Sequence, residues 1–115
     1  MDILHQKSYD FALRIVRLSE YLQTERKEFT LSKKILDSGT NIGLLIEEGK
    51  QGENKPDFIQ KYSVANKEAF KTNFLLRLLR DGEYLSPAHA ESLLVDCEEL
   101  QKILIATLKT LRKST

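Results

Sequence analysis

The sequence has few of the residues that build metal centres, redox sites or disulfide frameworks. Its 115 residues include one cysteine, two histidines and no tryptophan. One cysteine cannot form an internal disulfide or a cysteine-rich zinc site. Two histidines, His5 and His89, provide little for a metal or cofactor cage, and both are expected to be solvated. We therefore expect neither a metal nor a cofactor, and Cys97 is best explained as a small buried hydrophobic residue.

Long apolar runs are also missing. No stretch approaches the roughly 18 apolar residues of a membrane-spanning helix. The N-terminal stretch MDILHQKSYD is charged and lacks the apolar core of a signal peptide. A lone cysteine is typical of a reducing compartment. The sequence thus predicts a cytoplasmic protein that does not enter a membrane.

Charge of one sign does not dominate the chain. Lysine and arginine total 18, aspartate and glutamate total 17, and the net charge is +1. Hydrophobic residues make up 41% and charged residues 30%, which is typical of a folded globular domain. The balance is far from the strongly basic footprint of a dedicated nucleic-acid-binding protein. No glycine-rich phosphate-binding motif is present.

The chain does contain four segments with helical periodicity, at residues 3–24, 31–50, 56–81 and 87–112. Apolar residues recur in them at three, four or seven positions, which places them on one stripe of each helix. The stripes are formed by Leu4, Phe11, Ile15, Leu18 and Leu22; by Leu31, Ile35, Ile42 and Ile46; by Phe58, Tyr62, Ala65, Ala69, Leu76 and Leu79; and by Leu93, Cys97, Leu100, Leu104, Leu108 and Leu111.

Short polar breaks separate these segments and carry helix start and stop signals. Thr30 is expected to cap the second helix, Pro56 to begin the third, and Ser86 with Pro87 to open the fourth. Gly82 is expected to end the third helix in a left-handed conformation. Connections this short favour antiparallel neighbours. The prediction is a single all-α domain over residues 1–115, an antiparallel up-down-up-down four-helix bundle, with a three-helix hairpin or a swapped dimer as alternatives.

Several strings in the second and third segments resemble one bacterial protein family. They are LSKKILDSGTNIG at 31–43, EEG at 47–49, DFIQKYSVANKEA at 57–69 and LLRLL at 75–79. In this order and spacing they resemble the four-helix-bundle family of ribosomal RNA intervening sequence proteins, to which an accessory protein of diversity-generating retroelements is similar. The resemblance extends from about Tyr9 to Leu111. It implies a bundle that assembles into a ring, usually a pentamer, with no known enzymatic activity and with nucleic-acid binding as the usual proposal.

Three apolar residues lie on the outer sides of the predicted helices. Leu44 lies opposite the inner stripe of 31–50, and Phe70 and Phe74 lie opposite the inner stripe of 56–81, at about 100° per residue. Several exposed apolar residues on adjacent helices indicate a partner surface. We therefore predict that Leu44, Phe70 and Phe74 contact another copy of the chain.

The third segment is the basic one. Between residues 55 and 81, six lysines and arginines face three acidic residues, a net charge of +3. Cations beside an aromatic ring can contact phosphate while a base stacks on the ring. Lys61, Lys67, Lys71 and Arg77 are therefore the candidate nucleic-acid-binding residues. The alternative is a solvated face with Asp57–Lys61 and Glu68–Lys71 ion pairs.

Gly39 and Gly43 lie in the interior of the second segment, where each glycine costs roughly 1 kcal/mol relative to alanine. Close approach of a neighbouring helix is the expected compensation. No residue pattern predicts a catalytic centre, since serines lack a paired histidine and acid. The resulting hypothesis is a non-enzymatic, self-associating bundle that acts as an interaction or scaffold module. An RNA- or DNA-binding ring is the alternative.

Overall fold

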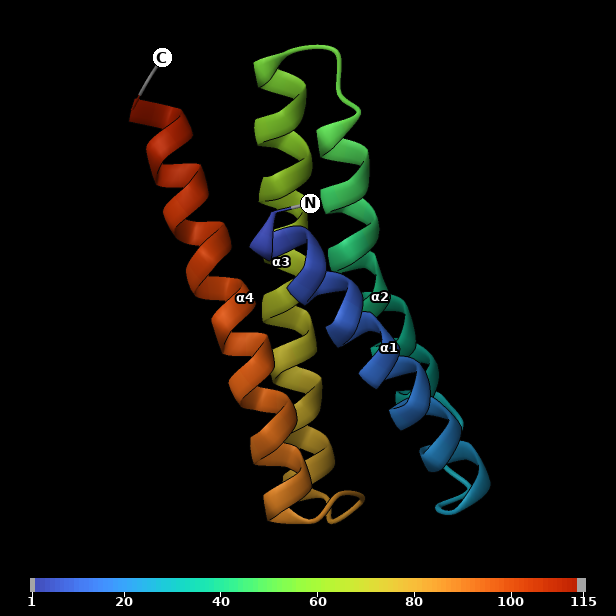
Figure 1. The fold of residues 1–115 in the computed structure, drawn as a ribbon. Helices are drawn as coiled ribbons and strands as arrows, with labels where there is room; N and C mark the ends of the chain where they lie inside the picture. Colours follow the sequence, from blue (N-terminus) through green and yellow to red (C-terminus); the bar gives the residue numbers. More distant parts are fainter. Residues whose placement is uncertain (1, 114–115) are drawn as a thin grey trace.

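A computed structural model describes residues 2–113 of the chain, and these residues form four α-helices. The helices are α1 (Ile3–Thr24), α2 (Thr30–Lys50), α3 (Lys55–Asp81) and α4 (Pro87–Lys113). Each bound lies within one residue of the range expected from sequence periodicity. The helices run up and down in turn and form an antiparallel four-helix bundle (Figure 1).

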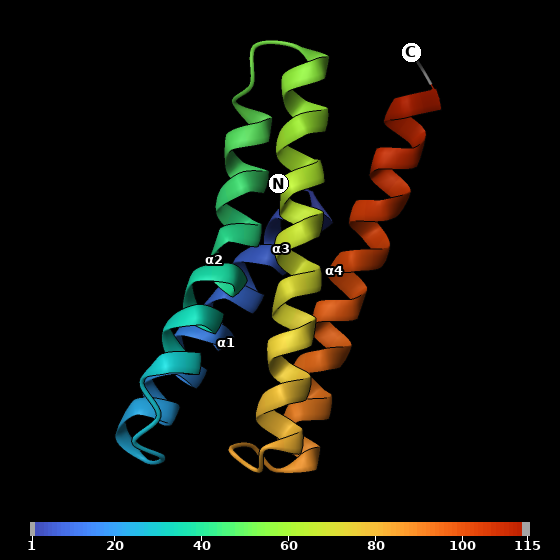
Figure 2. The same ribbon diagram turned by 180° about the vertical axis from the view of Figure 1, so that it is seen from behind.

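The helices pack in chain order around an elongated core. α2 packs on α1 and on α3, α3 packs on α4, and α1 closes the bundle against α4. Figure 2, the view from behind, shows α2 and α3 in front of α1. The molecule measures 47 × 22 × 21 Å, which fits helices of about 20 to 27 residues at 1.5 Å per residue. Within residues 2–113, no helix is long and apolar enough to cross a membrane.

The core is made of the apolar stripes identified in the sequence. Their members pack together in one continuous cluster, because each helix turns its stripe toward the bundle axis. The exceptions are Leu31, Phe58 and Leu111, which lie near helix ends and are only partly buried. Fully buried members include Phe11, Ile15, Leu22, Ile35, Ile42, Ile46, Tyr62, Leu76, Leu79, Leu93, Leu100 and Leu104.

In three of the four helices, the side chain of the N-cap residue itself caps the helix start. Asp2 accepts a hydrogen bond from the His5 amide at 2.8 Å, and Asn54 accepts one from the Asp57 amide at 3.0 Å. Ser86 accepts one from the His89 amide at 3.1 Å, as its position before Pro87 predicted. These bonds satisfy amides that have no partner inside the helix.

Two sequence predictions about helix ends are wrong. Thr30 does not cap α2, because it is already the first helical residue. The Glu28 carboxylate accepts from the Thr30 amide at 3.3 Å and the Ser32 amide at 2.8 Å. Gly82 does not take the left-handed conformation, since its φ is −80° and the positive φ of 66° belongs to Glu83.

Arg26 joins the two loops at one end of the bundle. Its guanidinium donates to the carbonyls of Glu83 at 3.0 Å and Tyr84 at 2.9 Å, and it lies 5.2 Å from the centroid of the Tyr84 ring. A guanidinium placed on carbonyls and a ring face in this way makes charge-assisted and cation–π contacts together. The α1–α2 loop is therefore held against the α3–α4 loop.

Candidate interaction surfaces

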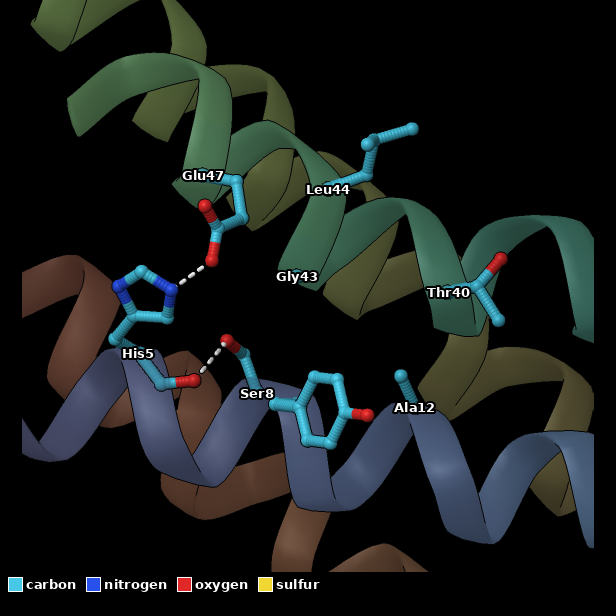
Figure 3. Close-up of a pocket in the computed structure, with 8 residues that line it drawn as sticks. His5, Ser8, Ala12, Thr40, Gly43, Leu44 and Glu47 are labelled. Atoms are coloured by element: carbon cyan, nitrogen blue, oxygen red, sulfur yellow. Dashed lines mark hydrogen bonds and ion pairs between the residues drawn. The ribbon is translucent and has the colours of Figure 1, made fainter. Parts of the chain in front are cut away.

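Two apolar surfaces lie beside α2. The first is a groove of about 460 Å³ between α1 and α2, which we call the α1–α2 groove. Small side chains and a glycine line it, and Leu44 stands at its α2 edge with its side chain directed away from α1 (Figure 3). The groove is lined by Ser8, Tyr9, Ala12, Thr40, Gly43 and Leu44, with His5 and Glu47 at one end.

The groove lies where α1 and α2 approach closely. A Cβ added at Gly39 would lie 2.8 Å from two side-chain atoms of Ile15, and one added at Gly43 would lie 3.3 Å from the Ser8 carbonyl oxygen. Real Cβ atoms essentially never come as near as the first distance. Both glycines therefore lie where the sequence analysis expected close helix packing, and larger residues would push α1 away from α2.

His5, Ser8 and Glu47 lie near one another but do not form a nucleophilic triad. The His5 imidazole pairs with the Glu47 carboxylate, while the Ser8 hydroxyl donates to the His5 backbone carbonyl at 3.0 Å (Figure 3). Ser8 is only 1% exposed. An activated serine needs its hydroxyl against the base and open to a substrate, and neither condition is met here.

Exposed apolar residues also form an outer stripe on α1, which was not among the predicted contact residues. Tyr9, Leu13 and Val16 are all exposed large hydrophobic residues. Their spacing of four and three puts them on one outer stripe of α1, opposite its buried stripe. That spacing was readable in the sequence. Tyr9 also lines the α1–α2 groove, so the stripe meets the groove at this residue.

The second surface is a row of apolar side chains on α3, at Phe70, Phe74 and Leu78, which we call the α3 ridge. Phe70 is 52% and Phe74 53% exposed, and all three residues follow one another at intervals of four. Such spacing places them on one outer stripe of the helix. Leu44, at 55% exposed, is not part of this ridge but belongs to the groove. The three apolar residues singled out in the sequence are thus divided between two surfaces.

The candidate nucleic-acid-binding cations have different surroundings. Lys71 lies 3.1 Å from the Glu68 carboxylate, so the expected i,i+3 pair is present. Lys61 lies 3.6 Å from Glu48 of α2 rather than beside Asp57. Among the described side chains, Lys67 is exposed and makes no hydrogen bond or ion pair.

Arg77 completes the charged border of the α3 ridge. Its guanidinium contacts two residues of its own helix. It donates a hydrogen bond to the Asn73 side-chain oxygen at 2.9 Å and lies 5.6 Å from the centroid of the Phe74 ring. A guanidinium over a ring face stabilises the ring's exposed position. Lys67, Lys71 and Arg77 therefore flank the ridge, whereas Lys61 belongs to the contact between α2 and α3.

Comparison with known proteins identifies the family of this bundle. Residues 3–106, nearly the whole chain, match the family described as 23S rRNA-intervening sequence protein. The chain belongs to this family. A crystal structure of a protein of unknown function from Bacteroides thetaiotaomicron, described as a member of the S23 ribosomal protein family, is 44% identical to it. The alignment covers 93% of this chain and 99% of that one, with a TM-score of 0.92. No protein of curated function matches the chain.

In this member of the 23S rRNA-intervening sequence protein family, the buried polar groups join helices. The hydroxyls of Ser38 and Thr72 lie 2.9 Å apart between α2 and α3, and Glu68 of α3 accepts from Asn41 of α2 at 3.4 Å. Buried polar groups need such partners, so these pairs favour one alignment of the two helices. The string Lys67-Glu68-Ala69, one of the pieces that resembled the family, therefore contributes to helix alignment.

Two titratable groups of the interior, Cys97 and Tyr62, favour their neutral forms. Burial raises the pKa of the Cys97 thiol to about 12, and burial with the nearby Asp2 carboxylate raises the pKa of Tyr62 to about 12. The Cys97 thiol donates to the Ala69 carbonyl at 3.3 Å. A thiol held neutral and buried is a poor nucleophile. In the described part of the chain, no three histidine, cysteine or acidic side chains lie close enough to hold a metal ion.

Proposed function

We propose that the protein is a non-catalytic interaction module that associates with itself through the two surfaces beside α2. The observation that carries this proposal is the exposure of Leu44, Phe70 and Phe74, each more than half exposed although the bundle interior is filled by other residues. The lone buried cysteine suits a reducing compartment, so we place the assembly in the cytoplasm.

The distribution of these residues supports a partner rather than chance exposure. Single exposed apolar residues are common on folded proteins. Here they gather on adjacent helices, with Tyr9 and Leu44 lining one groove and Phe70, Phe74 and Leu78 in a row on α3. Contiguous apolar patches on folded proteins mark interaction sites. The family resemblance suggests a ring of identical copies, and we adopt a homopentamer as the working assembly.

Light scattering after gel filtration tests the proposal on the unmodified chain. One copy has a mass of 13.3 kDa. The expected result at micromolar concentration is a single species whose mass is a multiple of this value, five times for the working assembly. A mass of 13.3 kDa across the micromolar range would contradict self-association, and a stable multiple other than five would correct the number of copies.

Nucleic-acid binding through the basic side of α3 is the alternative function. Lys67 is available for phosphate contact, whereas Lys71 and Lys61 already pair with Glu68 and Glu48. The test compares the parent chain with the Lys67→Glu, Lys71→Glu double variant on single-stranded RNA. The alternative predicts binding that weakens steeply as salt rises, and weaker binding by the variant. Equal binding by both proteins would exclude this surface.

A further inference from the structure

We infer that the self-association is head-to-tail: the α3 ridge of one copy occupies the α1–α2 groove of the next. This inference rests on the proposed self-association and specifies its geometry. It commits to a second copy of this chain as the occupant of the groove. Three properties of the two surfaces support it, namely their shapes, their charges and their positions around α2.

The two surfaces have complementary shapes. The groove is concave because Gly43, Ala12 and Ser8 leave its floor without large side chains. The ridge projects at Phe70 and Phe74, since about half of each side chain is exposed, and a hollow between α2 and α3 lies along the Phe74 side of it. A ridge that enters a groove excludes water from both, whereas two grooves placed face to face would enclose an empty space.

The charges of the two surfaces are also complementary. Lys67, Lys71 and Arg77 border the ridge. Among the residues that the structure describes, no lysine or arginine lines the groove. Its charged end carries Glu47, whose side chain is 53% exposed although it pairs with His5. Opposite charges across an interface favour the encounter of the two surfaces, and like charges brought together disfavour it.

Self-pairing of either surface is correspondingly unfavourable. A two-fold contact of ridge with ridge would gather the cations Lys67, Lys71 and Arg77 of two copies around one interface. A two-fold contact of groove with groove would bring two Glu47 carboxylates into one interface while the floors stayed apart. A two-fold interface must use one self-complementary surface, and neither surface has that property.

The positions of the surfaces favour closure of the assembly. The groove lies on the α1 side of α2, and Phe74 with Lys71 lies on the α3 side, where a second hollow is lined by Leu31, Lys34 and Asp37. The two surfaces therefore occupy adjacent faces of the bundle rather than opposite ones. Each copy is then turned relative to the one before it. Head-to-tail contacts with such a rotation form rings when the rotation closes.

Cysteine cross-linking of two variants tests the inference. One variant carries Leu44→Cys at the groove, the other Phe74→Cys on the ridge, and a peptide tag on one chain separates mixed from identical pairs on a gel. The native Cys97 stays in place, since it is buried and its thiol is neutral. The variants are mixed, allowed to exchange copies and treated with a short bismaleimide. The unmodified chain, treated in the same way, is the background control.

The inference predicts mixed dimers in the mixture and no dimers when either variant is treated alone. Identical pairs at Leu44→Cys or at Phe74→Cys in an assembled sample would overturn the head-to-tail geometry while leaving self-association intact. Absence of any cross-link in a sample that light scattering shows to be assembled would do the same. A monomeric unmodified chain would instead overturn the proposed function and the inference with it.

Because Phe74→Cys removes part of the ridge, Lys71→Cys serves as a second ridge variant that keeps both aromatic rings. Lys71 lies three residues before Phe74 on the same side of α3. It should also cross-link only to Leu44→Cys. Ile105→Cys on the outer side of α4, exposed but outside both surfaces, should not cross-link to either. Efficient cross-linking of Ile105→Cys to Leu44→Cys would contradict the assigned contact.

Discussion

The α1–α2 groove and the α3 ridge differ in how the same kind of residue is presented. Both surfaces expose apolar side chains, yet the groove has Gly43 and Ala12 at its floor, whereas the ridge has Phe70 and Phe74 at its crest. One surface is hollow and has an acid at its end, while the other projects and is bordered by cations. Apolar exposure alone therefore indicates a contact, but shape and charge indicate which surface meets which.

The difference originates in the way α2 packs on its two neighbours. Against α1, α2 presents glycines instead of larger residues. A Cβ at Gly39 would lie 2.8 Å from Ile15, and a Cβ at Gly43 would lie 3.3 Å from the Ser8 carbonyl oxygen. Against α3, polar pairs cross the contact, with Ser38 facing Thr72. Small residues permit a close approach and a hollow outside, whereas the polar pairs hold α3 in a fixed alignment.

The largest expected effect is the loss of the close contact that shapes the groove. Replacing Gly39 with leucine should lower the free energy of unfolding by roughly 3 kcal/mol, because its Cβ would lie 2.8 Å from Ile15. Thermal and urea unfolding measure the change. Lys33→Leu, at an exposed position of the same helix, is the control and should change stability little. An unchanged melting temperature for Gly39→Leu would show that α1 and α2 are not closely packed there.

The next effect concerns the ridge alone. Phe74→Glu should raise the concentration needed for assembly by about 30-fold, equivalent to about 2 kcal/mol, because a central aromatic contact is replaced by a charge. Folding should persist, since Phe74 is exposed and the new glutamate lies near Lys71 and Arg77. Dilution series in light scattering measure the shift, with circular dichroism as the folding control.

Ile105→Glu is the matched comparison for this ridge variant. Ile105 is 46% exposed on α4 and has Lys102 and Lys109 at helical spacing, as Phe74 has Lys71 and Arg77. It should assemble like the parent chain. Equal weakening by both substitutions would mean that exposed apolar area in general, rather than the α3 ridge, causes association.

A smaller effect on stability is expected at the hydrogen bond between Thr72 of α3 and Ser38 of α2, which aligns the two helices. Thr72→Val should cost about 1 kcal/mol of unfolding free energy, because the Ser38 hydroxyl loses its buried partner. Thr107→Val is the control, since Thr107 bonds only to the Ile103 carbonyl of its own helix in the described structure. If the two variants lost equal stability in chemical denaturation, the bond between α2 and α3 would contribute nothing beyond the bond within the helix.

The interior shared by both surfaces should respond to alkaline pH. The pKa values of Cys97 and Tyr62 are raised from 9.0 and 10.0 to about 12. Above pH 9 the unfolded chain loses these protons while the folded chain keeps them, so stability falls as pH rises toward 12. Urea unfolding across that interval measures the slope, which should be shallower in Cys97→Ala. Identical slopes in the two proteins would contradict the buried, neutral thiol.

Much of the fold could be predicted from the sequence because helical periodicity is a local property. The stripe of Phe11, Ile15, Leu18 and Leu22 determines which side of α1 faces inward, whatever the other helices do. The same kind of spacing places Tyr9, Leu13 and Val16 on an outer stripe of α1, so their exposure could also have been predicted from the sequence. The outer positions of Phe70 and Phe74 were found by this reasoning.

Contacts between helices could not be predicted in the same way. Lys61 pairs with Glu48 instead of Asp57, and this choice depends on the relative rotation of α2 and α3. The separation of Leu44 from the ridge depends on the packing of α1 against α2. The left-handed residue after α3 is Glu83 rather than Gly82, because the turn is set by bonds from Tyr84 and Leu85 to the Leu79 carbonyl.

Mixing two assembly-deficient chains tests the central claim most directly. Leu44→Glu damages the groove and leaves the ridge intact, whereas Phe74→Glu damages the ridge and leaves the groove intact. At a concentration only a few-fold above that at which the parent chain assembles, each variant alone should have a mass of 13.3 kDa in light scattering. An equimolar mixture, studied above the concentration at which the parent chain assembles, should form a dimer of twice that mass through the one undamaged pair of surfaces. A mixture that stays at 13.3 kDa would contradict head-to-tail association of groove and ridge.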